Sequence, residues 1–296
     1  MNVSIGLVIP IYIRSDSDLA NLEATLKSIE RLQCLPDQIV ITDDSEMLHF
    51  QSTNEILSKF HGMNIIYKKN PGPKGISANS NNGISELATD YVHCLHQDDI
   101  IVQADLYLRI LSVLKEGELR WVLLGGEADG HRIIPGLVKG LLPAEALCGL
   151  NTIGGPSCVI FPNIPSLRFD PQFNMLCDVA FFFNTQSELG APILFTNPEI
   201  HYGMGEWQEQ RRIAESEVLS EALKLTFVHS HFLYESIIRV FGYRKRFEVK
   251  MRALRVLQVA NRSSRLGWMI ELAIILILLR VKAANAGKKV FDSFAR

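Results

Sequence analysis

The sequence predicts an α/β domain in which a doubly wound, mostly parallel sheet is covered by helices on both faces. Short apolar runs alternate with amphipathic helical patterns from the N-terminus to residue 124. Strands separated by helices of roughly ten or more residues imply right-handed βαβ units and hence a parallel sheet. Acidic pairs follow two of the apolar runs, where the carboxyl ends of parallel strands present residues to a ligand. We therefore expect a ligand site along one edge of the sheet.

Each element rests on a local pattern. The first apolar run predicts a strand at 3–9, and Asp16 or Asp18 can cap a helix whose apolar face carries Leu22 and Leu26. The N-terminal run lacks the basic segment and cleavage site of a signal peptide, which favours a strand and a cytoplasmic protein. Further strands are expected at 38–42, 63–67, 91–95 and 121–124, and further helices at 53–60, 77–87 and 103–115.

Composition narrows the function classes. The chain has 296 residues, enough for one large domain with a tail or for two domains. Its formal net charge of -2 gives no whole-chain signature of nucleic-acid binding, so no nucleic-acid partner is expected. The five cysteines form no CxxC pair and lie in apolar surroundings, which indicates buried thiols in a reducing compartment rather than disulfides or a zinc site.

Chemically useful residues follow three predicted strands. They are Pro10, Tyr12 and Arg14 after the first, Asp43 and Asp44 after the second, and Asp98 and Asp99 after the strand at 91–95. Parallel strands would bring all three groups to one edge, where paired carboxylates suit a hard divalent cation. Each acid taken alone is equally consistent with a helix cap or a turn.

The loop at 70–75 adds backbone amides near the same edge. It contains Lys74 and Gly75, and a helix rich in Asn and Ser, including Asn79, follows it. Glycine lets the backbone approach a ligand closely, and a helix N-terminus favours anions. Neither GxxxxGK[ST] nor GxGxxG occurs here, which excludes a Walker or Rossmann dinucleotide site at this loop.

Four segments in order, VIPIYIR, ITDDSE, NPGPKGISANSNNGI and LHQDDI, resemble the N-terminal half of the family 2 glycosyltransferases of the GT-A fold. The resemblance extends over about residues 3–207 and suggests the bacterial surface-polysaccharide type. It implies a Rossmann-like nucleotide-binding half, an acceptor-binding half, a UDP- or dTDP-type sugar donor, and Mg²⁺ or Mn²⁺. One departure is His96, which replaces the first acid of the family's Asp-x-Asp motif.

On this resemblance, Pro10 and Tyr12 lie beside the base, Asp43 or Asp44 contacts the base or ribose, and metal is held at Asp98 and Asp99. The full set of expected donor-binding residues is Pro10, Tyr12, Arg14, Asp43, Asp44, Lys74, Gly75, Asn79, His96, Gln97 and Asp98.

The segment IGGPSCVIFPN resembles the lining of the family's acceptor pocket, and FDPQFNMLCD resembles the segment ending in its catalytic acid. Asp178 is then the general base, with Cys177 in place of the usual Glu, because an attacking hydroxyl must lose its proton to a nearby group. The alternative is that Asp178 caps a helix at 179–188, and both roles are compatible. HYGMGEWQEQRR resembles a segment that folds over the donor. The expected acceptor or lid residues are Gly155, Pro156, Ser157, His201, Glu206, Trp207 and Gln208.

The composition changes near residue 215, which predicts a catalytic domain at 1–214 and a helical region at 215–296. The pattern at 231–257 is basic and amphipathic, and 266–279 is strongly apolar but shorter than the roughly 20 residues that span a bilayer. Three interpretations stay open for 266–279: insertion at a membrane surface, packing against the catalytic domain or a second subunit, and a true span. Peripheral membrane contact through 231–282, at the inner face of the plasma membrane, follows from the first.

Together these patterns and the resemblance to family 2 glycosyltransferases imply a metal-dependent, inverting glycosyltransferase, hexosyl- or related, that transfers a sugar to a hydroxyl of a glycan or lipid-linked glycan. One alternative is a non-catalytic GT-A scaffold or regulator of a glycan assembly complex, because His96 and Cys177 depart from the family pattern. Another is a nucleotidyltransferase, although VIPIYIRSD lacks the glycine-rich loop that such enzymes carry after the first strand.

Overall fold

The computed structural model describes residues 3–115, 117–137, 140–143, 146, 151–203, 220–222, 224–225 and 228. By its internal contacts the chain divides into two units, Met1–Pro143 with Asn151–Ile213, and Ala144–Leu150 with Ala214–Arg296. The segments at 231–257 and 266–279 lie outside the described residues, so the helical C-terminal region and its membrane contact stay predictions. No helix in the described part of the chain is long and apolar enough to cross a membrane.

The first unit is built on a nine-stranded sheet with the order β3-β2-β1-β4-β8-β6-β9-β5, and β7 pairs with β6. The strands are β1 (Ile5–Ile11), β2 (Gln38–Asp43), β3 (Ile65–Lys69), β4 (Tyr91–Cys94), β5 (Ile100–Ile101), β6 (Val122–Ala128), β7 (His131–Ile133), β8 (Val159–Pro162) and β9 (Ile193–His201). β1, β2, β3 and β4 run parallel, and Ile11 at the end of β1 lies opposite Asp43 at the end of β2. The strand ends predicted to share an edge therefore share it.

The other half of the sheet is mixed. β8 runs antiparallel to both β4 and β6, and β5 runs antiparallel to β9, whereas β6 and β9 are parallel. The 3₁₀ turn η4 (Pro156–Cys158) leads directly into β8, which lies beside β4. An antiparallel neighbour needs no crossover helix before it, so the strand–helix alternation of the first half does not extend to this strand.

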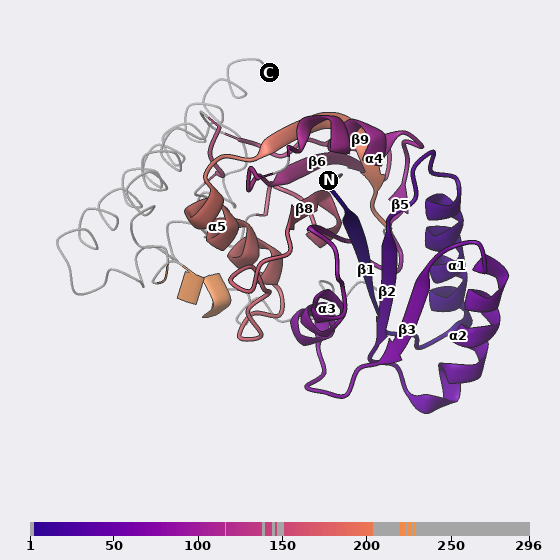
Figure 1. The fold of residues 1–296 in the computed structure, drawn as a ribbon. Coiled ribbons are helices and arrows are strands. Elements are labelled where there is room, and N and C mark those ends of the chain that lie inside the picture. Colours follow the sequence, from indigo (N-terminus) through magenta and orange to yellow (C-terminus); the bar gives the residue numbers. More distant parts are fainter. Residues whose placement is uncertain are drawn as a thin grey trace, which may run out of the picture. The chain divides into compact units, whose positions relative to one another are not determined.

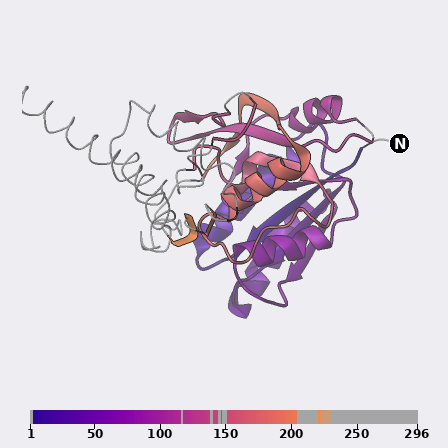
Figure 2. The same ribbon diagram turned by 90° about the vertical axis from the view of Figure 1, so that its left-hand side faces the viewer.

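Helices cover both faces of the sheet (Figure 1). α1 (Asp16–Glu30) and α2 (Phe50–Leu57) lie on one face, and α3 (Ile76–Ser85) and α5 (Cys177–Leu189) lie on the other. α4 (Leu106–Val113) follows β5 in the chain. Figure 2 shows the second face, with the purple α3 and the salmon α5 in front of the strands. The doubly wound arrangement is thus present.

The N-cap of α1 differs from the prediction, and the packing of α3 explains the position of its N-terminal end. α1 is capped by Ser15, whose side chain accepts a hydrogen bond from the backbone N–H of Asp18, so the caps predicted at Asp16 or Asp18 are wrong. α3 packs closely on β1 and β2, and this approach is possible because Gly83 of α3 has no side chain. A Cβ at Gly83 would lie only 2.6 Å from a methyl carbon of Val8. This close packing places the N-terminal end of α3 at the ends of β1 and β2.

Candidate functional site

A cavity of about 500 Å³ lies at the carboxyl ends of β1, β2 and β4. Its lining comes from the ends of these strands, the start of α3, the turn η4, the first turn of α5 and the end of β9. The predicted site residues that border it are Pro10, Tyr12, Arg14, Asp44, Lys74, Gly75, Asn79, His96, Gln97, Asp98, Asp99, Gly155, Pro156 and Asp178. The convergence of three strand ends expected from the sequence is therefore confirmed.

At the end of β1, Tyr12 presents an aromatic ring to the cavity, with its side chain 45% exposed. The Gln97 side chain bonds to the Tyr12 backbone in both directions, accepting from its N–H at 2.7 Å and donating to its carbonyl at 3.3 Å. Arg14 pairs with Asp18 at 3.1 Å and lies 5.6 Å from the centre of the Tyr12 ring. These contacts hold the ring where a planar base could stack on it.

The last residue of β2, Asp43, and the acid that follows it, Asp44, have different surroundings. Asp43 is buried outside the cavity lining and accepts hydrogen bonds from the Ser45 N–H, the Tyr67 hydroxyl and the Lys69 ammonium. Burial raises the pKa of Asp43, but these three donors outweigh it and hold the pKa below its usual range. Asp44 borders the cavity and accepts from the Gly75 N–H at 2.8 Å. Of the pair, Asp44 is thus the acid that a ligand in the cavity would meet.

The start of α3 lines the cavity beside the ends of β1 and β2. Gly75, the residue before the helix, has a φ of 117°, a conformation that favours glycine. The Asn79 amide nitrogen donates to the carbonyls of Ile11 at 3.2 Å and Thr42 at 3.0 Å. Its amide oxygen is buried and has no hydrogen-bond partner among the described residues. Asn79 therefore ties the two strand ends together beside the cavity.

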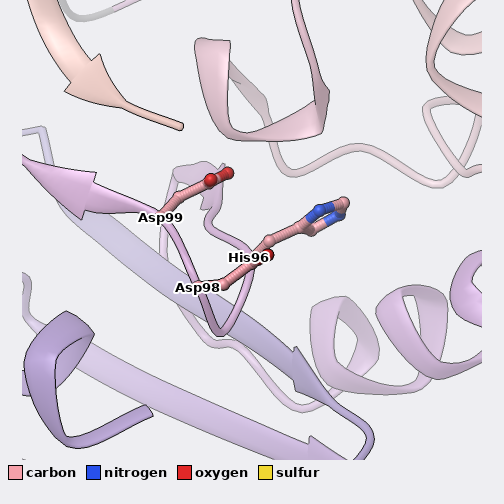
Figure 3. A group of neighbouring side chains, drawn as sticks. All are labelled: His96, Asp98 and Asp99. Carbon is pink, nitrogen blue, oxygen red and sulfur yellow. The ribbon is translucent and has the colours of Figure 1, made fainter. Parts of the chain in front are cut away.

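A cluster of His96, Asp98 and Asp99 lies on the loop after β4 (Figure 3), and one potential ligand atom from each falls within 4.8 Å of the others. Burial lowers the pKa of His96 despite the opposing charge of Asp98, so the imidazole is neutral at physiological pH. Burial, with the charge of Asp98, raises the pKa of Asp99 to about 7. A neutral imidazole and carboxylates are ligands of divalent metal ions, so the residues present fit such an ion.

Asp178 borders the cavity from α5 and is 7% exposed. The helix begins at Cys177 and its N-cap is Leu176, so the alternative that Asp178 caps this helix is wrong. Asp178 lies instead in the first turn, where the helix dipole favours a carboxylate. One of its oxygens accepts a hydrogen bond from the Asn151 amide at 2.6 Å. The carboxylate is thus held in a fixed orientation at the cavity wall.

Besides Asp43, two predicted residues of the described part lie outside the cavity lining. Ser157 is fully buried, and its hydroxyl donates to Asp99 and accepts from the His96 N–H. His201 lies 3.2 Å from Glu127 on the neighbouring strand β6. Glu206, Trp207 and Gln208 lie outside the described residues.

The residues that border the cavity but were not predicted as site residues include Asn174, Met175, Tyr202 and Gly203. Asn151, which holds Asp178, was not predicted either. Asn174 and Met175 immediately precede the motif that ends at Asp178, so proximity in sequence could have found them. Tyr202 and Gly203 follow β9, and only the pairing of β9 with β6 and β5 brings them here. Asn151 belongs to a glycine-containing turn and carries no distinguishing signal.

Comparison with known proteins agrees with this geometry. Residues 7–123 match the family model "Glycosyl transferase family 2". A search of curated proteins found no match.

Among solved structures, S. aureus TarS 1-349 in complex with UDP-GlcNAc is similar with a TM-score of 0.62 at 12% identity, over 88% of this chain and 81% of that one. Mannosyltransferase PcManGT from Pyrobaculum calidifontis, in complex with GDP-Man and Mn²⁺, gives 0.57 at 12% identity, over 94% and 81%. Glucosyl-3-phosphoglycerate synthase from Mycobacterium tuberculosis, with Mn²⁺ and UDP, gives 0.54 at 16% identity, over 75% and 80%. Residues 7–123 thus match the glycosyl transferase family 2 model, and the chain has the fold of these solved structures, the GT-A fold.

Proposed function

We propose that this protein is a glycosyltransferase that moves a sugar from a nucleoside diphosphate donor to an acceptor hydroxyl and inverts the anomeric centre. The observation that carries the proposal is one cavity with His96 and Asp98 on the loop after β4 and Asp178 on α5. Groups suited to a metal-bound diphosphate and a group suited to proton removal thus border the same space. The match of residues 7–123 to the glycosyl transferase family 2 model supports sugar transfer as the reaction of that combination.

The donor binds along the strand ends. The Tyr12 ring stacks on the base, and Asp44 accepts from the base or the ribose. Lys74 approaches the backbone carbonyl of Asp44 at 3.2 Å and contributes positive charge beside the phosphates. A divalent ion, Mg²⁺ or Mn²⁺, is held at Asp98, and when bound it neutralises the negative charge that develops on the departing diphosphate. Two structural neighbours crystallised with Mn²⁺, one with GDP-Man and one with UDP, support a metal-dependent donor site.

The acceptor binds on the side of α5. Asp178 takes the proton from the attacking hydroxyl, and Asn151 keeps the carboxylate oriented for that transfer. Inversion by direct displacement needs a single such base and no enzyme nucleophile, which fits one carboxylate on this wall. Gly155 and Pro156 border the same side of the cavity and line the acceptor path.

The acceptor class is a glycan or lipid-linked glycan, and the donor is of the UDP or dTDP type. The motifs of the N-terminal half support this donor type, and the amphipathic and apolar patterns in the sequence of 231–282 support a lipid-linked acceptor at the cytoplasmic face of a membrane. Catalysis is assigned to residues 1–214. GDP belongs in the test as well, because one structural neighbour binds GDP-Man.

The test is calorimetric titration of the full chain with UDP, dTDP and GDP, with and without Mn²⁺, followed by an assay for nucleoside diphosphate release from the matching sugar donor. The proposal expects one nucleotide to bind with a requirement for metal, and its sugar form to be turned over. Binding without any turnover on a panel of glycan acceptors would support the scaffold alternative. Absence of binding for all three nucleotides would reject a donor site in this cavity.

A further inference from the structure

We infer that the metal is held by His96 together with Asp98, that Asp99 is a positioning residue rather than a ligand, and that this ligand set favours Mn²⁺ over Mg²⁺. The inference rests on the proposed function, since it assigns the residues and metal class of that donor site. It departs from the sequence-based expectation, in which the metal lies between Asp98 and Asp99.

Asp99 is already committed to the fold. Its side chain is 4% exposed, and each carboxylate oxygen accepts a hydrogen bond, one from the Ser157 hydroxyl at 2.5 Å and one from the Gly203 N–H at 2.9 Å. Its backbone carbonyl accepts from the Thr25 hydroxyl at 2.9 Å. Turning this carboxylate to a metal would leave buried donors on η4 and at the end of β9 without a partner, which is costly. Asp99 therefore anchors the loop after β4.

His96 and Asp98 are differently placed. Both are only partly buried, and both border the cavity. The His96 backbone N–H is fixed by the Ser157 hydroxyl at 2.9 Å, which sets the course of the loop. The His96 Nε2 atom is buried and has no hydrogen-bond partner among the described residues. A buried polar atom without a partner calls for an ion, a water or a ligand group, and a carboxylate lies within 4.8 Å of the ring's ligating nitrogen.

The ligand chemistry sets the metal preference. Mg²⁺ takes oxygen ligands and binds nitrogen poorly, whereas first-row transition ions accept imidazole together with carboxylate. A nitrogen at position 96, where the family motif has a carboxylate, moves the preference from Mg²⁺ towards Mn²⁺ and the ions that follow it in the transition series. His96→Asp restores an all-oxygen site and should reverse this preference.

The experiment uses the full chain with Mn²⁺ as the probe, alone and with UDP, dTDP or GDP. Free Mn²⁺ is followed by electron paramagnetic resonance, Mg²⁺ is added as a competitor, and electron spin-echo modulation detects a coordinated ¹⁴N nucleus. Four variants are compared: His96→Asp, Asp98→Asn, Asp99→Asn and Asp99→Ala. His131→Asn is the matched control, because His131 is an exposed histidine on β7. Nucleotide binding is measured on the same samples.

The wild-type protein should show ¹⁴N modulation that persists in His131→Asn and disappears in His96→Asp. Competition by Mg²⁺ should improve at least about tenfold in His96→Asp, and Asp98→Asn should lose Mn²⁺ affinity by at least about tenfold. Asp99→Asn, which keeps the shape and an acceptor for Gly203, should retain the ¹⁴N signal, whereas Asp99→Ala should weaken Mn²⁺ binding.

Absence of ¹⁴N modulation in the wild type, or its persistence in His96→Asp, would overturn the role of His96 whether or not every variant folds. Equal losses in Asp99→Asn and Asp98→Asn would make Asp99 a ligand. If no nucleotide binds in any sample, the proposed function fails. If nucleotide binds but the nitrogen signal is missing, only the inference about the metal fails.

Discussion

The backbone N–H of Gly203 donates a hydrogen bond to the Asp99 carboxylate at 2.9 Å, which ties the end of β9 to the loop after β4. The two segments lie so close that a Cβ at Gly203 would come within 2.4 Å of the Asp98 carbonyl oxygen and 2.9 Å of the Asp98 Cβ. The position of Asp98, the acid proposed to hold the metal, therefore depends on a glycine that is distant in sequence.

Gly203→Ala should displace Asp98 and lower the affinity for Mn²⁺ and for the nucleoside diphosphate by about tenfold or more, the scale seen when the support of a metal ligand is lost. Calorimetry with the donor nucleotide measures both effects. Gly62→Ala is the matched control, because a Cβ there meets nothing within 4 Å. If Gly203→Ala bound metal and nucleotide as Gly62→Ala does, this packing would not position Asp98.

Asp178→Asn should reduce sugar transfer by about 10²–10⁴-fold while nucleotide affinity stays at the wild-type value, because the amide keeps the shape but accepts no proton. Asn151→Ala should give a smaller loss, since the base remains and only its orientation is released. Initial rates and nucleotide titrations on the same preparations measure the two quantities. Wild-type rates in Asp178→Asn would exclude it as the base.

His93 makes the folded state sensitive to acid. Its Nε2 lies 2.9 Å from the Ser157 carbonyl, which can only accept, so Nε2 carries the proton and Nδ1 accepts from the Tyr107 hydroxyl at 2.8 Å. Burial lowers the pKa of His93 from 6.5 to about 4, against the opposing effect of the Ser157 bond. Between pH 4 and pH 6.5, His93 therefore binds a proton more readily in the unfolded chain than in the folded one.

The free energy of unfolding should therefore fall as the pH is lowered from 6.5 towards 4, with His93 contributing at most about 1.4 kcal/mol per pH unit. His93→Gln lacks this titration, so urea unfolding at several pH values should give a shallower slope for the variant than for the wild type. The carboxylates with lowered pKa, such as Asp43, affect both proteins alike. Identical slopes, or an NMR titration showing His93 protonated near pH 6.5, would contradict the prediction.

The donor half of the site could be predicted because its positions follow from periodicity. Once β1, β2 and β4 are recognised as parallel strands, Tyr12, Asp44 and Asp98 must lie along one edge. Which acid of each pair faces the ligand depends on local hydrogen bonds. Asp43 accepts hydrogen bonds from Tyr67 and Lys69, and Asp99 accepts them from Ser157 and Gly203. No sequence pattern predicts those partners.

The wall of the cavity on the side of α5 was harder to predict from the sequence. Asp178 was found through a resemblance, but the start of its helix was misplaced by two residues, and the dependence of Asp178 on Asn151 is a contact between residues in different segments. Ser157 was expected beside the acceptor, yet it lies buried against the loop after β4, where its hydroxyl contacts His96 and Asp99. Such contacts depend on tertiary packing rather than on local propensity.

The division of work between Asp98 and Asp178 is tested most directly by titrating wild type, Asp98→Asn and Asp178→Asn with the donor nucleotide in Mn²⁺. The proposed function predicts that Asp98→Asn loses metal-dependent binding, whereas Asp178→Asn binds as the wild type does and yet transfers sugar about 10²–10⁴-fold more slowly. Undiminished metal-dependent binding in Asp98→Asn, or loss of binding in Asp178→Asn, would contradict it.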